Sequence, residues 1–182
     1  MGKTILGIDP GTNILGFGVI YSEGKSAKYI DMGVLDLRKE TVPYDKLRRI
    51  YSEIGAVCDK YLPDEMALES PFYGKNAQVV LKLGRAQGAA MLAALTRNIP
   101  ITEYAPRKAK EAVTGNGAAS KMQVNVILQR ILGIDIEEKF LDATDALAIA
   151  LCHHYQMSNP FAGMKSSSSW EKFISDNPDR VR

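Results

Sequence analysis

Cysteine and histidine are both scarce in this chain of 182 residues, which has two of each. The cysteines, Cys58 and Cys152, lie far apart in the sequence, and neither belongs to a CxxC pair. A zinc site or a disulfide framework needs more such residues at closer spacing, so we expect two buried free thiols. His153 and His154 are adjacent and would face different directions on a helix, which excludes an HExxH-like metal pair and favours packed or hydrogen-bonded histidines.

Long apolar runs are missing as well. No stretch approaches the roughly 20 apolar residues of a membrane span, and the first residues lack the basic, apolar and small segments of a signal peptide. With 46% apolar and 24% charged residues, the composition is typical of one globular domain with a substantial core. We therefore expect a cytoplasmic protein with no membrane partner.

Glycine motifs for nucleotide binding are incomplete. The segment GFGVIY at residues 16–21 has no third glycine for a dinucleotide fingerprint, and GKS at residues 24–26 lacks the glycine that a P-loop places five residues earlier. Both motifs therefore fail on spacing.

Charge is small overall but uneven along the chain. The net charge is +2, yet residues 75–130 carry +7 and the remainder carries −5. The basic residues of this segment are Lys75, Lys82, Arg85, Arg97, Arg107, Lys108, Lys110, Lys121 and Arg130. Such asymmetry indicates either a polyanionic partner or ordinary solvated helix faces.

The apolar periodicity predicts an α/β fold with a mixed sheet and helices on both faces. Strands are predicted at residues 4–9, 15–21, 28–37, 66–69 and 99–104, the first three joined by short polar links as antiparallel hairpins. Helices are predicted between Pro43 and Pro63 and at residues 76–97, 107–113, 120–132 and 142–155. Ser120 and Gln123 have the spacing of a capping box, and Gly133 is a helix stop.

Two of the strands end on an acid. An apolar run finishes at Asp9 just before Pro10 and Gly11, and the short strand of MALES finishes at Glu69 just before Ser70 and a proline. Asp9 alone could simply open a turn. Because neighbouring parallel strands ending on acids would bring those acids together, we also expect a functional cleft there.

A second pair of acids opens the last helix. Asp142 and Asp145 are three residues apart in DATDALAIALCHHY and therefore share one helix face. Taken alone, this spacing is also a routine helix opening, favoured by capping and by the helix dipole. Four carboxylates gathered together, however, would repel one another without cations, and oxygen ligands select Mg²⁺ or Mn²⁺. A two-metal phosphodiesterase site follows, which needs no nucleophilic side chain.

Several separated motifs together resemble the RuvC family of bacterial Holliday-junction resolvases. They are GIDPGTNILGFGVI, ALESPFYGKNA, LKLGRAQGAAM, the ASK step before Met122, and DATDALAIALCHH, in the family's order across about residues 3–155. The resemblance implies an RNase H-like fold with a five-stranded sheet, and a homodimer that cuts four-way DNA junctions symmetrically. It also implies two Mg²⁺ ions per site, with Mn²⁺ as a substitute, and the RuvA and RuvB branch-migration proteins as partners.

Site residues are carried over by matching position. The residues that match the family's catalytic, metal-holding acids are Asp9, Glu69, Asp142 and Asp145; some members have histidine in place of Asp142. Phe72 matches an aromatic residue that stacks on a junction base. Lys110 and Lys121 match DNA-contacting positions, and neighbouring Arg107 and Lys108 are further candidates for phosphate contact.

The resemblance also bears on assembly and on the tail. The helix at residues 76–97 is apolar over most of its circumference, with a stripe that reads Val80, Gly84, Gly88, Met91 and Leu95 and is widened by Leu81, Ala89 and Leu92. Its glycines could admit a second copy of the chain or fit the helix to its own sheet. We expect residues 1–157 to form the nuclease domain and 158–182 a tail that can dock a short helix.

Two other functions remain open at this stage. GIDPGT also resembles the first phosphate loop of actin-like and Hsp70-like ATPases, but those proteins need two such domains and a second glycine-rich loop. A non-catalytic junction-binding module is the other alternative, which the intact acids oppose.

Overall fold

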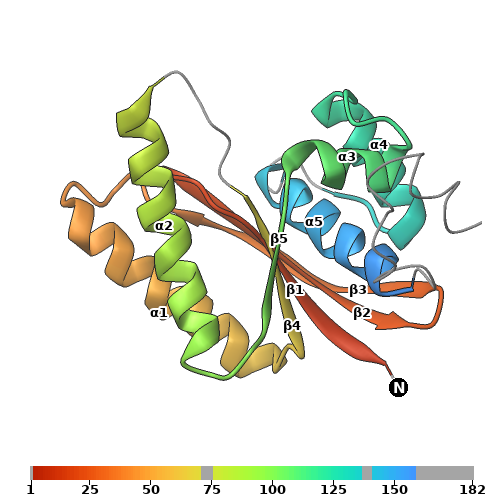
Figure 1. The fold of residues 1–182 in the computed structure, drawn as a ribbon, viewed down its shortest axis with the longest axis horizontal. Helices are drawn as coiled ribbons and strands as arrows, with labels where there is room; N and C mark the ends of the chain where they lie inside the picture. The colour runs from red at the N-terminus through yellow and green to blue at the C-terminus, as the bar shows by residue number, and fades with distance from the viewer. Residues whose placement is uncertain (1, 71–75, 137–140, 159–182) are drawn as a thin grey trace, which may run out of the picture.

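The computed structural model describes residues 2–70, 76–136 and 141–158, and Figure 1 shows their arrangement. The strands are β1 (Lys3–Asp9), β2 (Ile14–Glu23), β3 (Ser26–Asp36), β4 (Glu65–Glu69) and β5 (Ile101–Tyr104). The helices are α1 (Pro43–Tyr61), α2 (Ala77–Leu95), α3 (Pro106–Thr114), α4 (Lys121–Leu132) and α5 (Leu141–Ser158). Each predicted strand and helix is confirmed, with shifts of a few residues at the ends.

The strands form one mixed sheet in the order β3-β2-β1-β4-β5. β2 pairs antiparallel with both β1 and β3, as the hairpin links predicted. β4 pairs parallel with β1 and with β5. The carboxyl ends of β1, β3, β4 and β5 therefore lie along one edge of the sheet.

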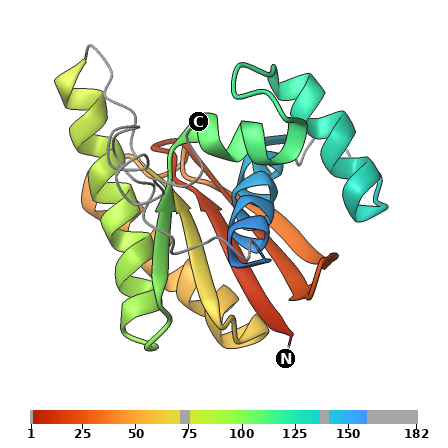
Figure 2. The same cartoon turned by 45° about the vertical axis from the view of Figure 1, so that its right-hand side comes forward.

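Helices cover both faces of the sheet, which confirms the predicted fold class (Figure 1). On one face, α1 and α2 pack over a core that contains Leu6, Ile8 and Met66. On the other face, α5 lies over a second core that contains Ile5 and Ala67, and α3 and α4 complete that layer (Figure 2). Leu6 and Ile8 lie on one face and Ile5 on the other because successive strand side chains alternate between faces.

Local signals in the sequence set several helix ends. The Ser120 side chain accepts from the backbone N–H of Gln123, and the Gln123 side chain accepts from the N–H of Ser120, so the predicted capping box is present. Gly133 ends α4 with a φ of 65°, a left-handed conformation that glycine adopts without strain. Asn76 caps α2 by accepting from two backbone N–H groups.

The scarce residues have the structural roles that their spacing indicated. Cys58 and Cys152 are buried free thiols. His153 lies between Tyr104 and Glu65, with its Nδ1 2.7 Å from the tyrosine hydroxyl and its Nε2 2.7 Å from a carboxylate oxygen. Within the described ranges, no helix is long and apolar enough to cross a membrane.

Helix α5 lies unusually close to the strands beneath it because glycines line the sheet there. A Cβ atom placed on Gly7 of β1 would lie 2.0 Å from the carbonyl oxygen of Ala146. One placed on Gly16 of β2 would lie 2.4 Å from the carbonyl oxygen of Asp142. Any side chain at either position must therefore push α5 away from the sheet.

We predict that Gly7→Ala lowers the free energy of unfolding by about 1–3 kcal/mol, because the added methyl group meets backbone that cannot yield locally. Ala56→Ser is the matched control, since it also adds one heavy atom but on the exposed face of α1. Urea unfolding of both variants measures the difference. Equal stability of the two variants would show that the packing under α5 can accommodate a side chain at position 7.

Candidate active site

The sheet itself brings the first two acids together. β1 and β4 are parallel neighbours in which Gly7 pairs with Ala67 and Ile8 with Leu68, so Asp9 and Glu69 are the next residues along both strands. Ile5 and Ala67 face α5, and by strand alternation Asp9 and Glu69 point to the same side. Both acids are half-buried.

Helix α5 supplies the other two acids from above. Asp142, in its first turn, has a side chain that is 51% exposed, and Asp145, three residues further along the same face, has one that is 16% exposed. The close approach over Gly16 fixes this turn next to the end of β1, since Gly16 pairs with Asp9. Four acids predicted from separate motifs thus lie at one edge of the sheet.

A lysine lies among these carboxylates. The Lys121 ammonium is 2.7 Å from an Asp145 oxygen and 3.8 Å from an Asp142 oxygen. Lys121 is the first residue of α4, so the capping box at Ser120 and Gln123 fixes the position from which its side chain extends. Burial lowers the pKa of Lys121, but the hydrogen bond and the charge of Asp145 outweigh it and leave a net upward shift. The lysine therefore stays charged and offsets part of the local negative charge.

Asp9 and Glu69 both have raised pKa values, because they are buried close to other carboxylates. Burial, and then the charges of Glu69 and Asp145, raise the pKa of Asp9 to about 8. Burial and the charge of Asp145 raise the pKa of Glu69 to about 7, against the opposing effect of Lys110 and Lys121. Near neutral pH and without a bound cation, Asp9 consequently retains its proton and Glu69 is partly protonated.

This donor set fits hard divalent cations. Every candidate ligand is a carboxylate, which is the ligand type that Mg²⁺ and Mn²⁺ prefer. Burial and then the neighbouring carboxylates raise these pKa values, and a bound cation would oppose both effects. Across the described ranges, no three His, Cys, Asp or Glu side chains are already gathered closely enough to hold a metal ion. Metal binding would thus require these carboxylates to move closer together.

The predicted DNA-contact residues divide into groups. Lys110 and Lys121 lie close enough to the acids to affect the pKa of Glu69. Lys108 instead has its ammonium 5.3 Å from the centre of the Tyr104 ring, and Arg107 packs beside Gly117. Phe72 falls outside the described residues, so its predicted stacking role stays a prediction.

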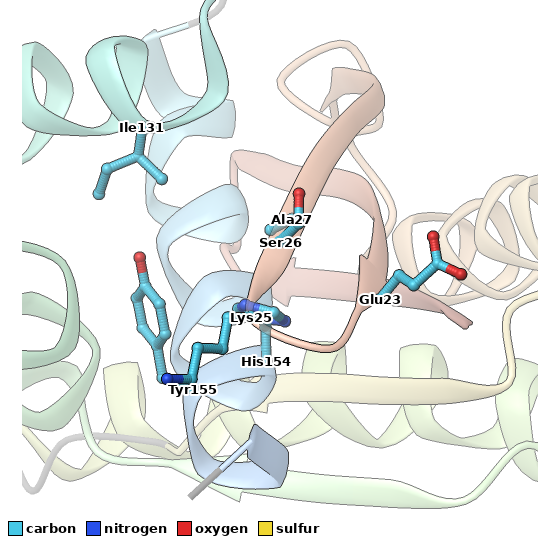
Figure 3. Close-up of a pocket in the computed structure, with 7 residues that line it drawn as sticks. All are labelled: Glu23, Lys25, Ser26, Ala27, Ile131, His154 and Tyr155. Carbon is cyan, nitrogen blue, oxygen red and sulfur yellow. The ribbon is translucent and has the colours of Figure 1, made fainter. Parts of the chain in front are cut away.

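A depression of about 490 Å³ lies elsewhere on the molecule (Figure 3). It is bounded by the β2–β3 hairpin, by Ile131 of α4 and by His154 and Tyr155 of α5. The hairpin end of β2 is remote from Gly16 and hence from the acids. His154 bonds through Nδ1 to the Ser22 hydroxyl, its Nε2 lacks a partner among the described residues, and burial lowers its pKa. We assign this depression no part in the candidate site.

Two features of the site were not anticipated from the sequence. In the sequence, Gly16 belonged to an incomplete nucleotide-binding motif, whereas in the structure it makes room for the backbone at Asp142. Lys121, which is predicted to contact DNA, also pairs with two of the acids in the structure, and the sequence did not indicate this pairing. The spacing of Gly16 and Gly18 at alternate positions of β2 was the available signal for the first, since alternate residues share a face.

Comparison with known proteins identifies the family. The family described as "Crossover junction endodeoxyribonuclease RuvC" matches residues 5–153. A protein of that name from Bacteroides fragilis is 55% identical over 182 residues, covering 99% of this chain and 96% of its own length. The ATPase alternative, which would need a second domain, finds no support in these matches.

Similar solved structures support the same family. RuvC of Thermus thermophilus has a TM-score of 0.76 at 31% identity and covers 85% of this chain and 95% of its own. The same organism's RuvC in complex with a Holliday junction substrate gives 0.79 at 29% identity, with 86% and 95% covered. On this sequence and structural similarity, the chain belongs to the RuvC family of crossover junction endodeoxyribonucleases.

Proposed function

We propose that this chain resolves four-way DNA junctions by hydrolysing one phosphodiester bond in each of two strands of like polarity. The observation that carries the proposal is the convergence of Asp9, Glu69, Asp142 and Asp145 at one edge of the sheet from β1, β4 and α5. Junction DNA as substrate is supported by the family and by the similar Thermus thermophilus complex.

The four acids are proposed to hold two Mg²⁺ ions, with Mn²⁺ as a substitute. Bound there, such ions supply an activated water and stabilise the charge on the leaving oxygen. Bound cations would favour the ionised forms of Asp9 and Glu69, because a nearby positive charge lowers carboxyl pKa values. Lys121, now paired with Asp145, would then be available to a phosphate oxygen.

The remaining contacts to DNA are proposed for basic residues of α3 and for Phe72. Lys110 lies beside Glu69 and can neutralise a phosphate next to the scissile one. Arg107 and Lys108 belong to the same helix and extend that surface. Phe72 follows Glu69 by three residues and can stack on a base at the junction.

A homodimer through α2 is also proposed. Leu81, Leu92 and Leu95 are more than half exposed on this helix, and a Cβ atom at Gly84 or Gly88 would meet nothing within 4 Å. The open glycines disfavour the alternative that they fit α2 to its own sheet. The exposed stripe differs from the predicted one, because Val80 and Met91 are partly buried and Met91 packs on the core.

Other assignments follow from the family alone. RuvA and RuvB are proposed as partners in branch migration, and the cytoplasm as the compartment, because the substrate is DNA in recombination and repair. We also propose residues 1–157 as the nuclease domain and 158–182 as a tail that docks a short helix; residues 159–182 lie outside the described ranges.

Cleavage of a labelled synthetic four-way junction tests the function. We expect cutting with Mg²⁺ and none with EDTA. Asp9→Asn, Glu69→Gln and Asp145→Asn should each abolish cutting while junction binding survives, since binding depends mainly on phosphate contacts. Glu103→Gln, an exposed acid on β5, is the control and should cut like the parent. Cutting by Asp9→Asn near the parental rate would rule out this site.

A stability measurement tests the crowding of the acids independently of catalysis. In EDTA, the unfolded chain ionises Asp9 near pH 4, whereas the folded chain holds its proton up to about pH 8. The protonated carboxyl therefore stabilises the fold at low pH, and this contribution is lost as pH rises through about 8.

We thus expect Asp9→Asn to be more stable than the parent at pH 8.5 by about 1–3 kcal/mol, with the difference vanishing near pH 4. Urea unfolding in EDTA at both pH values provides the measurement, with Glu103→Gln again as control. A less stable Asp9→Asn at pH 8.5 would contradict the charge repulsion.

The dimer is tested by Gly88→Glu. A charged side chain in the open stripe of α2 should yield folded monomers that no longer make paired cuts, because a twofold interface meets the substitution on both sides. Light scattering measures the mass, and far-ultraviolet circular dichroism checks the fold. A parent protein that is monomeric at micromolar concentration would overturn the dimer.

A further inference from the structure

A second cationic side chain, Arg38, lies beside the edge strand that is farther from Lys110. Arg38 follows β3, an edge strand, whereas Lys110 belongs to α3, which follows the other edge strand β5. Arg38 lies outside the basic segment of residues 75–130, so the uneven charge distribution along the sequence does not point to it.

The Arg38 guanidinium is held in a fixed direction by Asp36. Its Nε is 2.9 Å from Oδ1 and its Nη2 is 2.7 Å from Oδ2, a two-point fork. The backbone N–H of Arg38 also donates to Oδ1 at 3.0 Å. Since the pair is exposed, with side-chain exposures of 64% and 40%, it contributes little to stability. Its main physical effect is to orient the guanidinium.

Asp36 and Arg38 lie on the same side of the sheet as the four acids. Leu35 and Leu37 are buried in the core beneath α1 and α2. By strand alternation, Val34 and Asp36 then face α5. The backbone N–H of Leu37 donates to the Asn13 carbonyl at 2.7 Å, which ties this end of β3 to the loop after Asp9.

The register places Arg38 close to Asp142. Gly16 lies beneath the Asp142 carbonyl and pairs with Val34, two residues before Asp36. Hydrogen bonding to Asp36 and the charge of Asp36 raise the pKa of Arg38, and the charge of Asp142 adds to the shift. The acids are thus flanked by Lys110 on the β4 side and by Arg38 on the β3 side.

We propose that Arg38 binds a backbone phosphate of the cleaved strand, on the far side of the four acids from Lys110. The fork to Asp36 uses two of the five guanidinium N–H donors and leaves three for phosphate oxygens. β3 lies two strand spacings from β1, or about 10 Å, so the contacted phosphate lies within a few nucleotides of the cut. This inference rests on the proposed function, because it names a further contact to the same substrate.

Paired arginine variants test the contact. Arg38→Ala is compared with Arg48→Ala, whose parent side chain is 80% exposed and 3.2 Å from Asp45 on α1, over the opposite face of the sheet. Binding of a labelled junction is measured in EDTA across a salt series. We expect Arg38→Ala to lose about tenfold in affinity and about 0.9 in the salt slope, and Arg48→Ala to match the parent. Melting temperatures of both should equal the parental value.

A chemical substitution in the DNA locates the phosphate. Junctions with a neutral methylphosphonate at one position each are scanned along the cleaved strand. One position within a few nucleotides of the cut should weaken binding by the parent but not by Arg38→Ala, which is the non-additivity expected of a direct contact.

The outcomes separate the two proposals. A parent protein that does not bind the junction overturns both the proposed function and this contact. The Arg38 contact alone is overturned if the parent binds and cuts the junction while Arg38→Ala and Arg48→Ala have the same salt slope and the same methylphosphonate profile.

Discussion

The burial of several carboxylates close to one another is the constraint on which the rest of this structure depends. Asp9 and Glu69 are half-buried with two further acids nearby, and their pKa values rise to about 8 and about 7 as a result. A site with this much like charge persists only where the surrounding fold forces the groups together. The paired strands, the fixed first turn of α5 and the nearby Lys121 are the elements that do so.

The glycine-lined floor beneath α5 shows how backbone packing positions chemistry. Helix and sheet approach until the carbonyls of Asp142 and Ala146 lie where side chains of β1 and β2 would be. At the far end of the same helix, His153 bonds to Tyr104 of β5 and Glu65 of β4. Close packing at one end and hydrogen bonds at the other leave α5 little freedom to shift, so the acids of its first turn are presented rigidly.

The charges around the site form a pattern across the sheet. Lys110 acts on Glu69 from the β5 side, Lys121 pairs with Asp145, and Arg38 acts on Asp142 from the β3 side. Negative charge at the centre suits cations and positive charge at both sides suits phosphates. A polyanionic strand and its metal ions therefore find complementary charges in one surface.

The sequence by itself determined the elements, the mixed sheet and the identity of the four acids, because apolar periodicity, capping residues and strand ends are local signals. The capping box at Ser120 and the stop at Gly133 are examples. Only the tertiary structure decided that Gly16 makes room for Asp142, that Lys121 pairs with Asp145, and that Arg38 lies beside Asp142. Each of these depends on strand register or on the seating of a helix, which brings together residues more than 20 positions apart that no local pattern connects.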